Sequence, residues 1–212
     1  VHDELTILPV SGILNELNIE YAVSGGMAVS VWGNPRATFD IDILVLMKQP
    51  DVVRLAGALK KFDELGYLDE EMITDALENK GEFNFIHSDT NLKVDFWVIG
   101  NDEISQNELR RKVVKKIDGQ DINFISSEDL ILSKLRWHED SQSTRHLEDI
   151  TSILKFSVGK LDMDYLEKWA KKINSAEILI NYGGTGCISQ VNWITPTKIR
   201  TISLTGTLGH IE

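Results

Sequence analysis

The sequence has almost no cysteine, since Cys187 is the only one among 212 residues. A single thiol cannot close an internal disulfide, so we expect a fold that depends on packing alone, in a reducing, cytoplasmic compartment. No apolar run approaches the ~20 residues that cross a bilayer. The first ten residues, VHDELTILPV, also lack the basic start and small-residue cleavage site of a secretory signal. We therefore expect no membrane partner.

Basic side chains are scarce as well: 22 Lys and Arg stand against 33 Asp and Glu, which gives a net charge of −11. A broad basic surface for non-specific nucleic-acid binding is not expected, because phosphate repulsion would dominate. A local basic groove, or a substrate whose phosphates arrive with Mg²⁺, is compatible with this charge, and so is a simple contribution to solubility. The five histidines show no metal-ligand spacing such as H-E-x-x-H, so no zinc site is expected.

The rest of the composition, 42% hydrophobic and 26% charged, is typical of a globular chain with one sizeable domain or a domain plus a small appendage. Its hydrophobic periodicity predicts an α/β (α+β) fold. Strands are expected at 21–23, 40–47, 83–87 and 92–98, followed by a hairpin of 111–117 with 122–125. Helices are expected at 4–18, 27–32, 50–65 and 70–79.

The character of the chain changes at Ser126. Three amphipathic helices are expected at 127–137, 144–156 and 162–173, the first of them capped by Ser126 or Ser127. The last 32 residues hold six Thr and five Gly, and their only acidic residue is Glu212. We expect irregular strands or a loosely ordered tail there, or an unrelated extension, with no chemistry. The predicted domains are a core at 1–125, a helical C-terminal lobe at 126–180 and an irregular tail at 181–212.

Two carboxylates, Asp40 and Asp42, begin a strand of Ile, Leu and Val that otherwise looks buried. Side chains alternate along a strand, so these two lie on one face, ~7 Å apart, and can bind a hard cation between them. A D-x-D pair alone is weak evidence, because it also occurs in calcium loops, in glycosyltransferases and at solvated strand ends. An ionised carboxylate that is buried without a partner is costly, so a positive group is expected beside them.

Two further features strengthen this interpretation. Ser24-Gly25-Gly26 lies between a short strand and a helix, where glycine allows close backbone approach and the helix start offers N–H groups to phosphate. A third carboxylate, Asp95, lies in a predicted strand with Lys93 on the same face. Taken alone, the glycines could form only a tight turn and Asp95 only a salt bridge with Lys93. Together, a phosphate cradle and three carboxylates on strands suit two-metal phosphoryl transfer.

The order Gly25-Gly26, short helix, Arg36-x-Thr38-x-Asp40-x-Asp42, and later Lys93-x-Asp95 resembles the nucleotidyltransferase superfamily of DNA polymerase β type. Within it, the sequence is most similar to the AbiEii/AbiGii-toxin-like branch. The stretches 127–135 and 145–150 are similar to that family's helical Lys and Arg-x-x-x-Asp elements, so the resemblance covers roughly 20–155. It implies a nucleotidyltransferase core with a mixed β-sheet flanked by helices, and a helical C-terminal lobe that closes the cleft.

The resemblance also implies roles for the phosphate-binding and metal-binding residues. Ser24, Gly25 and Gly26 would hold the β- and γ-phosphates of a nucleoside triphosphate. Asp40 and Asp42 would bind Mg²⁺, with two ions expected. The third carboxylate, Asp95, would share the second ion and help to deprotonate the acceptor hydroxyl.

Four basic or polar side chains complete the implied nucleotide site. Lys134 would neutralise triphosphate charge, and Arg36 and Thr38 would brace the metal-binding strand or touch the phosphates. Arg145 would contact the nucleotide, although one helical turn separates it from Asp149, and a surface ion pair between the two is the favoured alternative. Tryptophans 32, 97, 137 and 169 are expected in the core or in the cleft wall rather than as base-stacking platforms.

The implied reaction is Mg²⁺-dependent transfer of a nucleoside monophosphate from NTP to an acceptor hydroxyl. The toxin-like branch suggests that the acceptor is RNA, such as a tRNA end, or protein, and that an antitoxin protein is a partner. A first alternative is a small-molecule acceptor of the aminoglycoside type, because an acidic cleft suits a polycation. A second is a regulatory module that has lost turnover, against which the three carboxylates argue.

Overall fold

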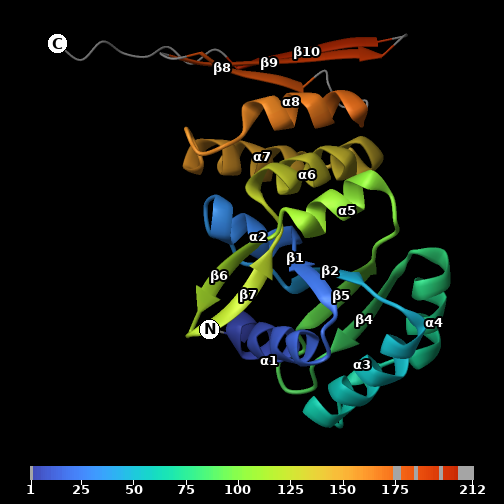
Figure 1. Ribbon diagram of the computed structural model, residues 1–212. Coiled ribbons are helices and arrows are strands. Elements are labelled where there is room, and N and C mark those ends of the chain that lie inside the picture. The colour runs from blue at the N-terminus through green and yellow to red at the C-terminus, as the bar shows by residue number, and fades with distance from the viewer. Residues whose placement is uncertain (1, 174–177, 184–185, 196–197, 205–212) are drawn as a thin grey trace.

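The computed structural model describes residues 2–173, 178–183, 186–195 and 198–204 (Figure 1). Its main feature is a seven-stranded mixed sheet in the order β3-β4-β5-β2-β1-β7-β6. The strands are β1 (Glu20–Val23), β2 (Asp40–Leu46), β3 (Tyr67–Leu68), β4 (Glu82–Ile86), β5 (Lys93–Val98), β6 (Val113–Ile117) and β7 (Gln120–Phe124). The expected strands at 21–23, 40–47, 83–87 and 92–98 are thereby confirmed.

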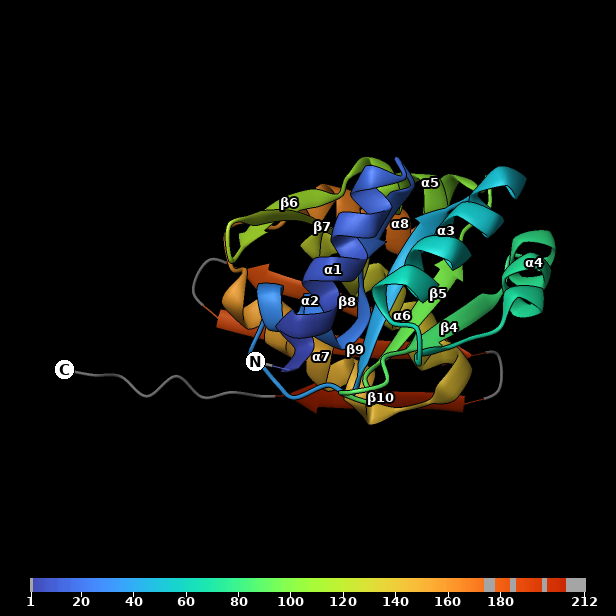
Figure 2. The same ribbon diagram turned by 90° about the horizontal axis from the view of Figure 1, so that it is seen from below.

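Helices lie on both sides of this sheet. Viewed from below, α1 (His2–Glu16) and α3 (Gln49–Phe62) cross one face, with α4 (Glu70–Asn79) beside them (Figure 2). On the other side α2 (Gly25–Trp32) contacts β2 and also packs against the C-terminal helices. Four of these helices match the expected ones, and α2 begins two residues earlier than predicted because Gly25 and Gly26 already belong to it.

The C-terminal helices are α6 (Ser127–Ser141), α7 (Thr144–Phe156) and α8 (Met163–Lys172). All three were expected. The predicted cap of α6 also forms: Ser126 accepts a hydrogen bond from the Asp129 amide at 3.1 Å. Beyond them, β8 (Ile178–Gly183), β9 (Gly186–Thr195) and β10 (Lys198–Leu204) form an antiparallel sheet. The predicted tail otherwise lies outside the described residues.

One helix was missed: α5 (Glu103–Arg110), which leads into the β6–β7 hairpin. Its end displaces the start of the first hairpin strand from the predicted Arg111 to Val113, and the turn contracts to Asp118 and Gly119. Asp102 caps this helix by accepting a hydrogen bond from the Ser105 amide at 3.0 Å. Because α5 has only two apolar residues, its hydrophobic pattern is weak, and the N-cap that would have marked it was not recognised.

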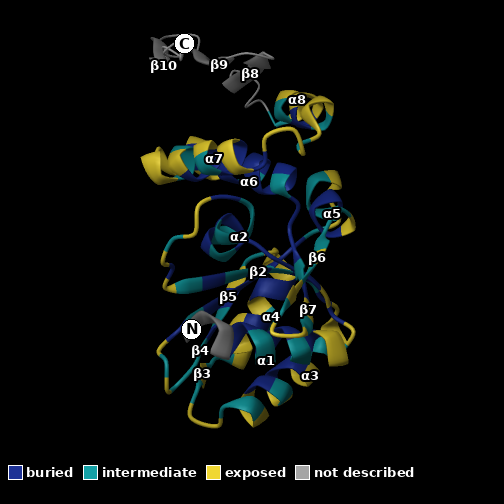
Figure 3. Ribbon diagram, turned by 90° about the vertical axis from the view of Figure 1, so that its left-hand side faces the viewer, coloured by how far each residue is buried: buried dark blue, intermediate teal, exposed yellow. Residues whose placement is uncertain are grey.

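The alternation of β2 decides where the core and the cavity lie. Ile41, Ile43 and Val45 are fully buried, whereas the residues between them are partly exposed on the opposite face. Buried residues line the sheet and the inner faces of its helices (Figure 3). The strand pairs antiparallel with β1 and parallel with β5, so it lies at the centre of the sheet. One strand thus serves the core with one face and a site with the other.

A buried polar network joins the end of α5, α6 and α8. Asp129 accepts hydrogen bonds from the hydroxyls of Ser126 at 2.6 Å and Tyr165 at 2.5 Å, and it forms an ion pair with Arg111 at 3.3 Å. The Arg111 guanidinium also stacks on the Tyr165 ring, 3.8 Å from its centroid. Since Asp129 is 2% exposed, each of these partners offsets the cost of burying its charge.

We expect Tyr165→Phe to lower the free energy of unfolding by ~1–3 kcal/mol, because a buried hydrogen bond to a charged group is lost. Tyr67→Phe is the matched control, since Tyr67 is 53% exposed, and its effect should stay within about 0.5 kcal/mol. Urea unfolding followed by circular dichroism measures both. Equal stability of the two variants would show that the Tyr165 hydroxyl does not anchor α8.

Within the described residues, no helix combines the length and the apolar character that crossing a membrane requires.

Candidate active site

A cavity of about 800 Å³ opens between the sheet and the helical lobe. All ten residues that the sequence singles out line it: Ser24, Gly25, Gly26, Arg36, Thr38, Asp40, Asp42, Asp95, Lys134 and Arg145. They come from the N-cap and first turn of α2, the loop before β2, two adjacent strands and two lobe helices. Segments up to 121 residues apart in the sequence therefore meet around one space, and the individual roles of these residues remain predictions.

Gly25 is required by close approach to a carboxylate. Its φ is +59°, and a Cβ added there would lie 1.7 Å from Oδ2 of Asp42. The next residue is confined as well, since a Cβ on Gly26 would lie 2.6 Å from Oγ1 of Thr38. The backbone amide of Ser24 donates to the Asp42 carbonyl at 2.8 Å, which ties the start of α2 to β2. The side chain of Ser24 makes no capping hydrogen bond with this helix.

We expect Gly25→Ala to destabilise the protein by ~1–3 kcal/mol and to displace the Asp42 carboxylate, because the new methyl group meets both steric and backbone strain. Gly57→Ala is the matched control. Gly57 lies within α3 with no atom within 4 Å of an added Cβ, so alanine there should be neutral or stabilising by up to ~1 kcal/mol. Thermal unfolding compares the two, and a Gly25→Ala protein as stable as wild type would contradict the close approach.

Three carboxylates lie on two adjacent strands. In the parallel pairing of β2 with β5, Asp42 is opposite Asp95 and Asp40 is opposite Lys93. Each carboxylate has an internal donor: Thr38 Oγ1 lies 2.6 Å from Asp40 and Trp97 Nε1 lies 3.4 Å from Asp42. The ion pair of Asp95 with Lys93, 2.8 Å long, also forms, so this salt bridge and a place in the cavity are not exclusive.

The electrostatics of Asp42 reflect crowding of like charge. Burial is the largest effect that raises its pKa, followed by the negative charge of Asp40; the Trp97 hydrogen bond and the Lys134 charge oppose them, and Asp95 adds the smallest raising effect. A carboxylate in this position is hard to ionise without a nearby cation. Clusters of this kind are typical of functional sites, where a bound ion relieves the repulsion.

The donor set fits Mg²⁺, because carboxylate oxygens are the ligands that this ion prefers. In the part of the chain that the structure describes, no three His, Cys, Asp or Glu side chains are grouped as a ready metal-binding cluster. The reason lies in the contacts above: Asp40, Asp42 and Asp95 each point to an internal donor. Rotation of these side chains is therefore part of any metal-binding model.

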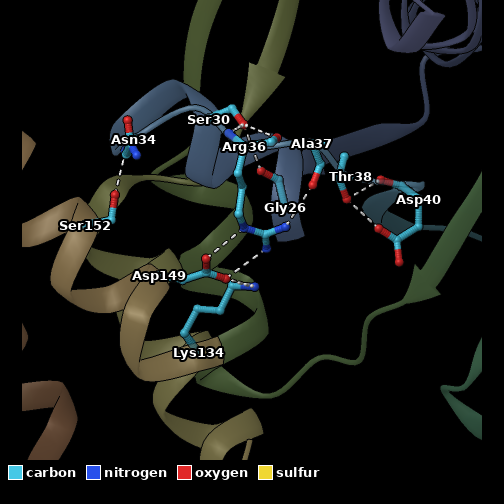
Figure 4. A network of polar contacts seen from close by, with 10 residues as sticks. All are labelled: Gly26, Ser30, Asn34, Arg36, Ala37, Thr38, Asp40, Lys134, Asp149 and Ser152. Atoms are coloured by element: carbon cyan, nitrogen blue, oxygen red, sulfur yellow. Dashed lines mark hydrogen bonds and ion pairs between the residues drawn. The ribbon is translucent and has the colours of Figure 1, made fainter. Parts of the chain in front are cut away.

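Asp149 of α7 connects the lobe to the loop before β2 (Figure 4). Its Oδ1 accepts from Nε of Arg36 at 2.9 Å, and its Oδ2 accepts from Nη2 of Arg36 and pairs with Nζ of Lys134, both at 3.0 Å. Burial works against ionisation of Asp149, but the hydrogen bonds and charges of Arg36 and Lys134 outweigh it and keep its pKa below the usual value.

This geometry corrects the predicted pair of Arg145 with Asp149. Arg145 is exposed at the cavity, whereas Asp149 is 3% exposed and turned toward Arg36 and Lys134. Arg36 and Lys134 reach the buried Asp149 carboxylate from inside the protein, whereas the exposed Arg145 guanidinium would have to lose its hydration to reach it. Among the described residues Arg145 forms no ion pair, so its contact with a nucleotide stays a prediction.

We expect Asp149→Asn to lower the free energy of unfolding by ~2–4 kcal/mol at pH 7, since two partly or fully buried cations lose their counter-charge. The folded-state pKa of Asp149 is depressed, so this difference should be present above pH ~4 and shrink as pH falls below it. Asp121→Asn, which removes an exposed partner of Lys116, should cost less than about 1 kcal/mol. Denaturant unfolding at pH 7 and pH 3.5 distinguishes the two variants.

Residues at the other end of the cavity were missed from the sequence. They come from α5, its N-cap and the second half of α6: Asp102, Ser105, Glu108, Arg136, Trp137 and Asp140. We call this set the α5–α6 end. Recognition of Asp102 as a helix cap would have revealed α5, but no pattern in the sequence marks which side of that helix is buried.

The tryptophans are placed as predicted. Trp97 of β5 and Trp137 of α6 line the cavity and meet edge to face, with ring centroids 5.1 Å apart and an interplanar angle of 73°. Trp169 belongs to the hydrophobic core, and Trp32 is partly buried and packs against this core. The cavity therefore has an aromatic wall that runs from the sheet to the lobe.

Comparison with known proteins adds a fold assignment. No protein-family model matches the sequence, and no curated protein matches it either. The crystal structure of ANT(2'')-Ia in complex with adenylyl-2''-tobramycin matches with a TM-score of 0.58 at 16% identity, over 82% of this chain and 98% of that one. The solution structure of ANT(2'')-Ia matches with a TM-score of 0.54 at 16% identity, over 80% and 91%.

These likenesses show that the chain has a nucleotidyltransferase-type fold, and the predicted fold class is confirmed. The AbiEii/AbiGii-toxin-like branch stays a prediction from the sequence motifs.

Proposed function

We propose that this protein is an Mg²⁺-dependent nucleotidyltransferase that moves a nucleoside monophosphate from NTP to an acceptor hydroxyl. The observation that carries the proposal is the arrangement of one glycine pair and three carboxylates around a single cavity, on a nucleotidyltransferase-type fold. The likeness to a protein whose structure contains an adenylylated aminoglycoside supports the same class of reaction.

The phosphates of the NTP would lie at the Ser24-Gly25-Gly26 turn, where the start of α2 presents its amides. Arg36 and Lys134, held by Asp149, would add positive charge beside them. The acceptor oxygen attacks the α-phosphorus, an O–P bond forms, the bond from the α-phosphorus to the bridging oxygen breaks, and pyrophosphate leaves. The acceptor proton passes to Asp95 or to solvent.

Asp40, Asp42 and Asp95 would hold Mg²⁺ in this scheme. When bound, the ion neutralises triphosphate charge and stabilises the attacking and leaving oxygens. The three side chains must first give up their contacts with Thr38, Trp97 and Lys93. Crowding of negative charge at Asp42 favours that exchange, because a cation relieves it.

Two chemical classes of acceptor are proposed. Resemblance to the toxin-like branch supports RNA, such as a tRNA end, or a protein side chain, with an antitoxin as partner. The second candidate is a small molecule of the aminoglycoside type, which the likeness to ANT(2'')-Ia favours. The regulatory alternative without turnover is less well supported, because a domain without chemistry has no need for three adjacent carboxylates.

We expect the protein to transfer label from α-³²P-labelled NTPs in the presence of Mg²⁺, tested against total RNA, a protein lysate and tobramycin as acceptors. Asp42→Asn should lower the rate about a thousandfold, since several kcal/mol of metal-borne charge stabilisation are lost. Asp121→Asn, an exposed carboxylate on β7, should leave it unchanged. If Asp42→Asn turns over as fast as wild type, the metal assignment is wrong, and if no acceptor gains label and no NTP binds, the enzyme assignment fails.

A further inference from the structure

We propose that the α5–α6 end of the cavity is the acceptor subsite, and that the carboxylate of Glu108 binds a protonated amine of a small cationic acceptor there. This inference rests on the proposed nucleotidyl transfer and names the chemistry of its second substrate.

Glu108 is a buried acid whose carboxylate has no hydrogen-bond or ion-pair partner among the described residues. It is 6% exposed and lines the cavity from α5. Its neighbours on α5, Asn107 and Leu109, are buried with it, so the side chain is held on the inward face of the helix. An unpaired buried carboxylate is costly when it is ionised, and a partner of opposite charge that enters the cavity would relieve this cost.

The surroundings of Glu108 offer more negative than positive charge. The charges that act on it are those of Arg136 and Asp129 in α6 and Asp102 at the cap of α5, and its own charge acts on Tyr165 in α8. Asp129 is already satisfied by Ser126, Tyr165 and Arg111, as described above. Asp140 also lines this end. Arg136 is exposed and lies beyond ion-pair distance, so one distant cation stands against several acids.

Different charged groups surround Asp42 and Glu108 at the two ends of the cavity. The charges that act on Asp42 are those of Asp40, Lys134 and Asp95, and none of them is among those that act on Glu108. Glu108 is not among the charges that act on Asp42, so a ligand at the α5–α6 end meets a different set of charges from one beside Asp42. A ligand that brings its own positive charge finds there a carboxylate without an ion-pair partner among the described residues.

The aromatic wall links this end to the reacting atoms. Trp97 donates to Asp42 at 3.4 Å and contacts Trp137, which follows Arg136 on α6. An acceptor that lies along these rings can place an amine at Glu108 and a hydroxyl near the carboxylates of β2. Aromatic faces also attract cations directly, which suits an amine-bearing ring or chain.

Burial raises the pKa of Glu108 to about 7, against an opposing effect of Arg136. Below that pH the group is mostly neutral and attracts a cation weakly, and above it the carboxylate is formed. The amines of spermidine should stay charged in this range, as the lysine amine does. The apparent affinity for spermidine should therefore rise about tenfold between pH 6 and pH 8, as the ionised fraction of Glu108 rises.

The experiment compares Glu108→Gln with Glu103→Gln, which removes the same charge from the exposed side of α5, where Glu103 pairs with Lys172. Tobramycin and spermidine are titrated by calorimetry at pH 6 and pH 8, and Mg²⁺–ATP is titrated in parallel. We expect Glu108→Gln to weaken both cations at least tenfold at pH 8 and to abolish the pH dependence. Its affinity for Mg²⁺–ATP, and all affinities of Glu103→Gln, should stay within twofold of wild type.

Stability separates a binding role from a structural one. The folded-state pKa of Glu108 lies above its unfolded value, so its ionisation costs stability as pH rises toward 8. Glu108→Gln should therefore raise the melting temperature by about 2–6 °C at pH 8 and by less at pH 5. A structural residue, such as an internal partner of Arg136, would instead lower it on removal.

The proposal is overturned if wild type binds neither cation, if Glu108→Gln binds them as wild type does, or if RNA is labelled at a rate that Glu108→Gln leaves unchanged. Should the variant fail to fold, the wild-type titration of spermidine decides, because a flat profile between pH 6 and pH 8 removes the role of Glu108. Failure of wild type to bind Mg²⁺–ATP would instead remove nucleotidyl transfer, and the cation titrations would still show whether this end binds amines.

Discussion

The structure depends most on the charge of Asp149, which is buried between Arg36 and Lys134. This one carboxylate joins α7 and α6 to the loop before β2, and so fixes the lobe against the strand that carries Asp40 and Asp42. Without it, two cations at the cavity would repel each other and the loop would lose its anchor. The same contact gives Arg36 and Lys134 a defined position before any nucleotide arrives, which is the condition for electrostatic stabilisation without reorganisation.

A second theme is the cost of concentrating acids. Asp42 and Glu108 both have raised pKa values, and burial is the largest cause for each. The fully buried aliphatic face of β2, formed by Ile41, Ile43 and Val45, supplies the opposing stabilisation within the same strand as the first of them. The fold thus holds unfavourable charge on one side of a sheet whose other side is apolar, which is how a marginally stable protein can retain a strained site.

Local patterns predicted most of the fold. The apolar runs of the strands and the amphipathic helices of the lobe were recognisable because their periodicity matches their burial, as in β2 and α7. The helix α5 was not, since it has only two apolar residues and its buried face carries Asn107 and Glu108. Long-range pairing also lies beyond local pattern: Arg36 and Asp149 are 113 residues apart, and sequence spacing pointed to Arg145 instead. The glycine pair and the acids were found because their chemistry is unusual where they occur.

The close approach of Gly25 to Asp42 has an evolutionary consequence. Position 25 cannot carry a Cβ while the Asp42 side chain keeps its observed position, because the two would occupy the same space. The two positions are therefore coupled, because the Asp42 side chain restricts position 25 to glycine. A lineage that lost the carboxylate would relieve the steric part of this constraint, although the positive φ would still disfavour other residues. Drift at position 25 in related sequences would thus signal that the chemistry at position 42 had already been abandoned.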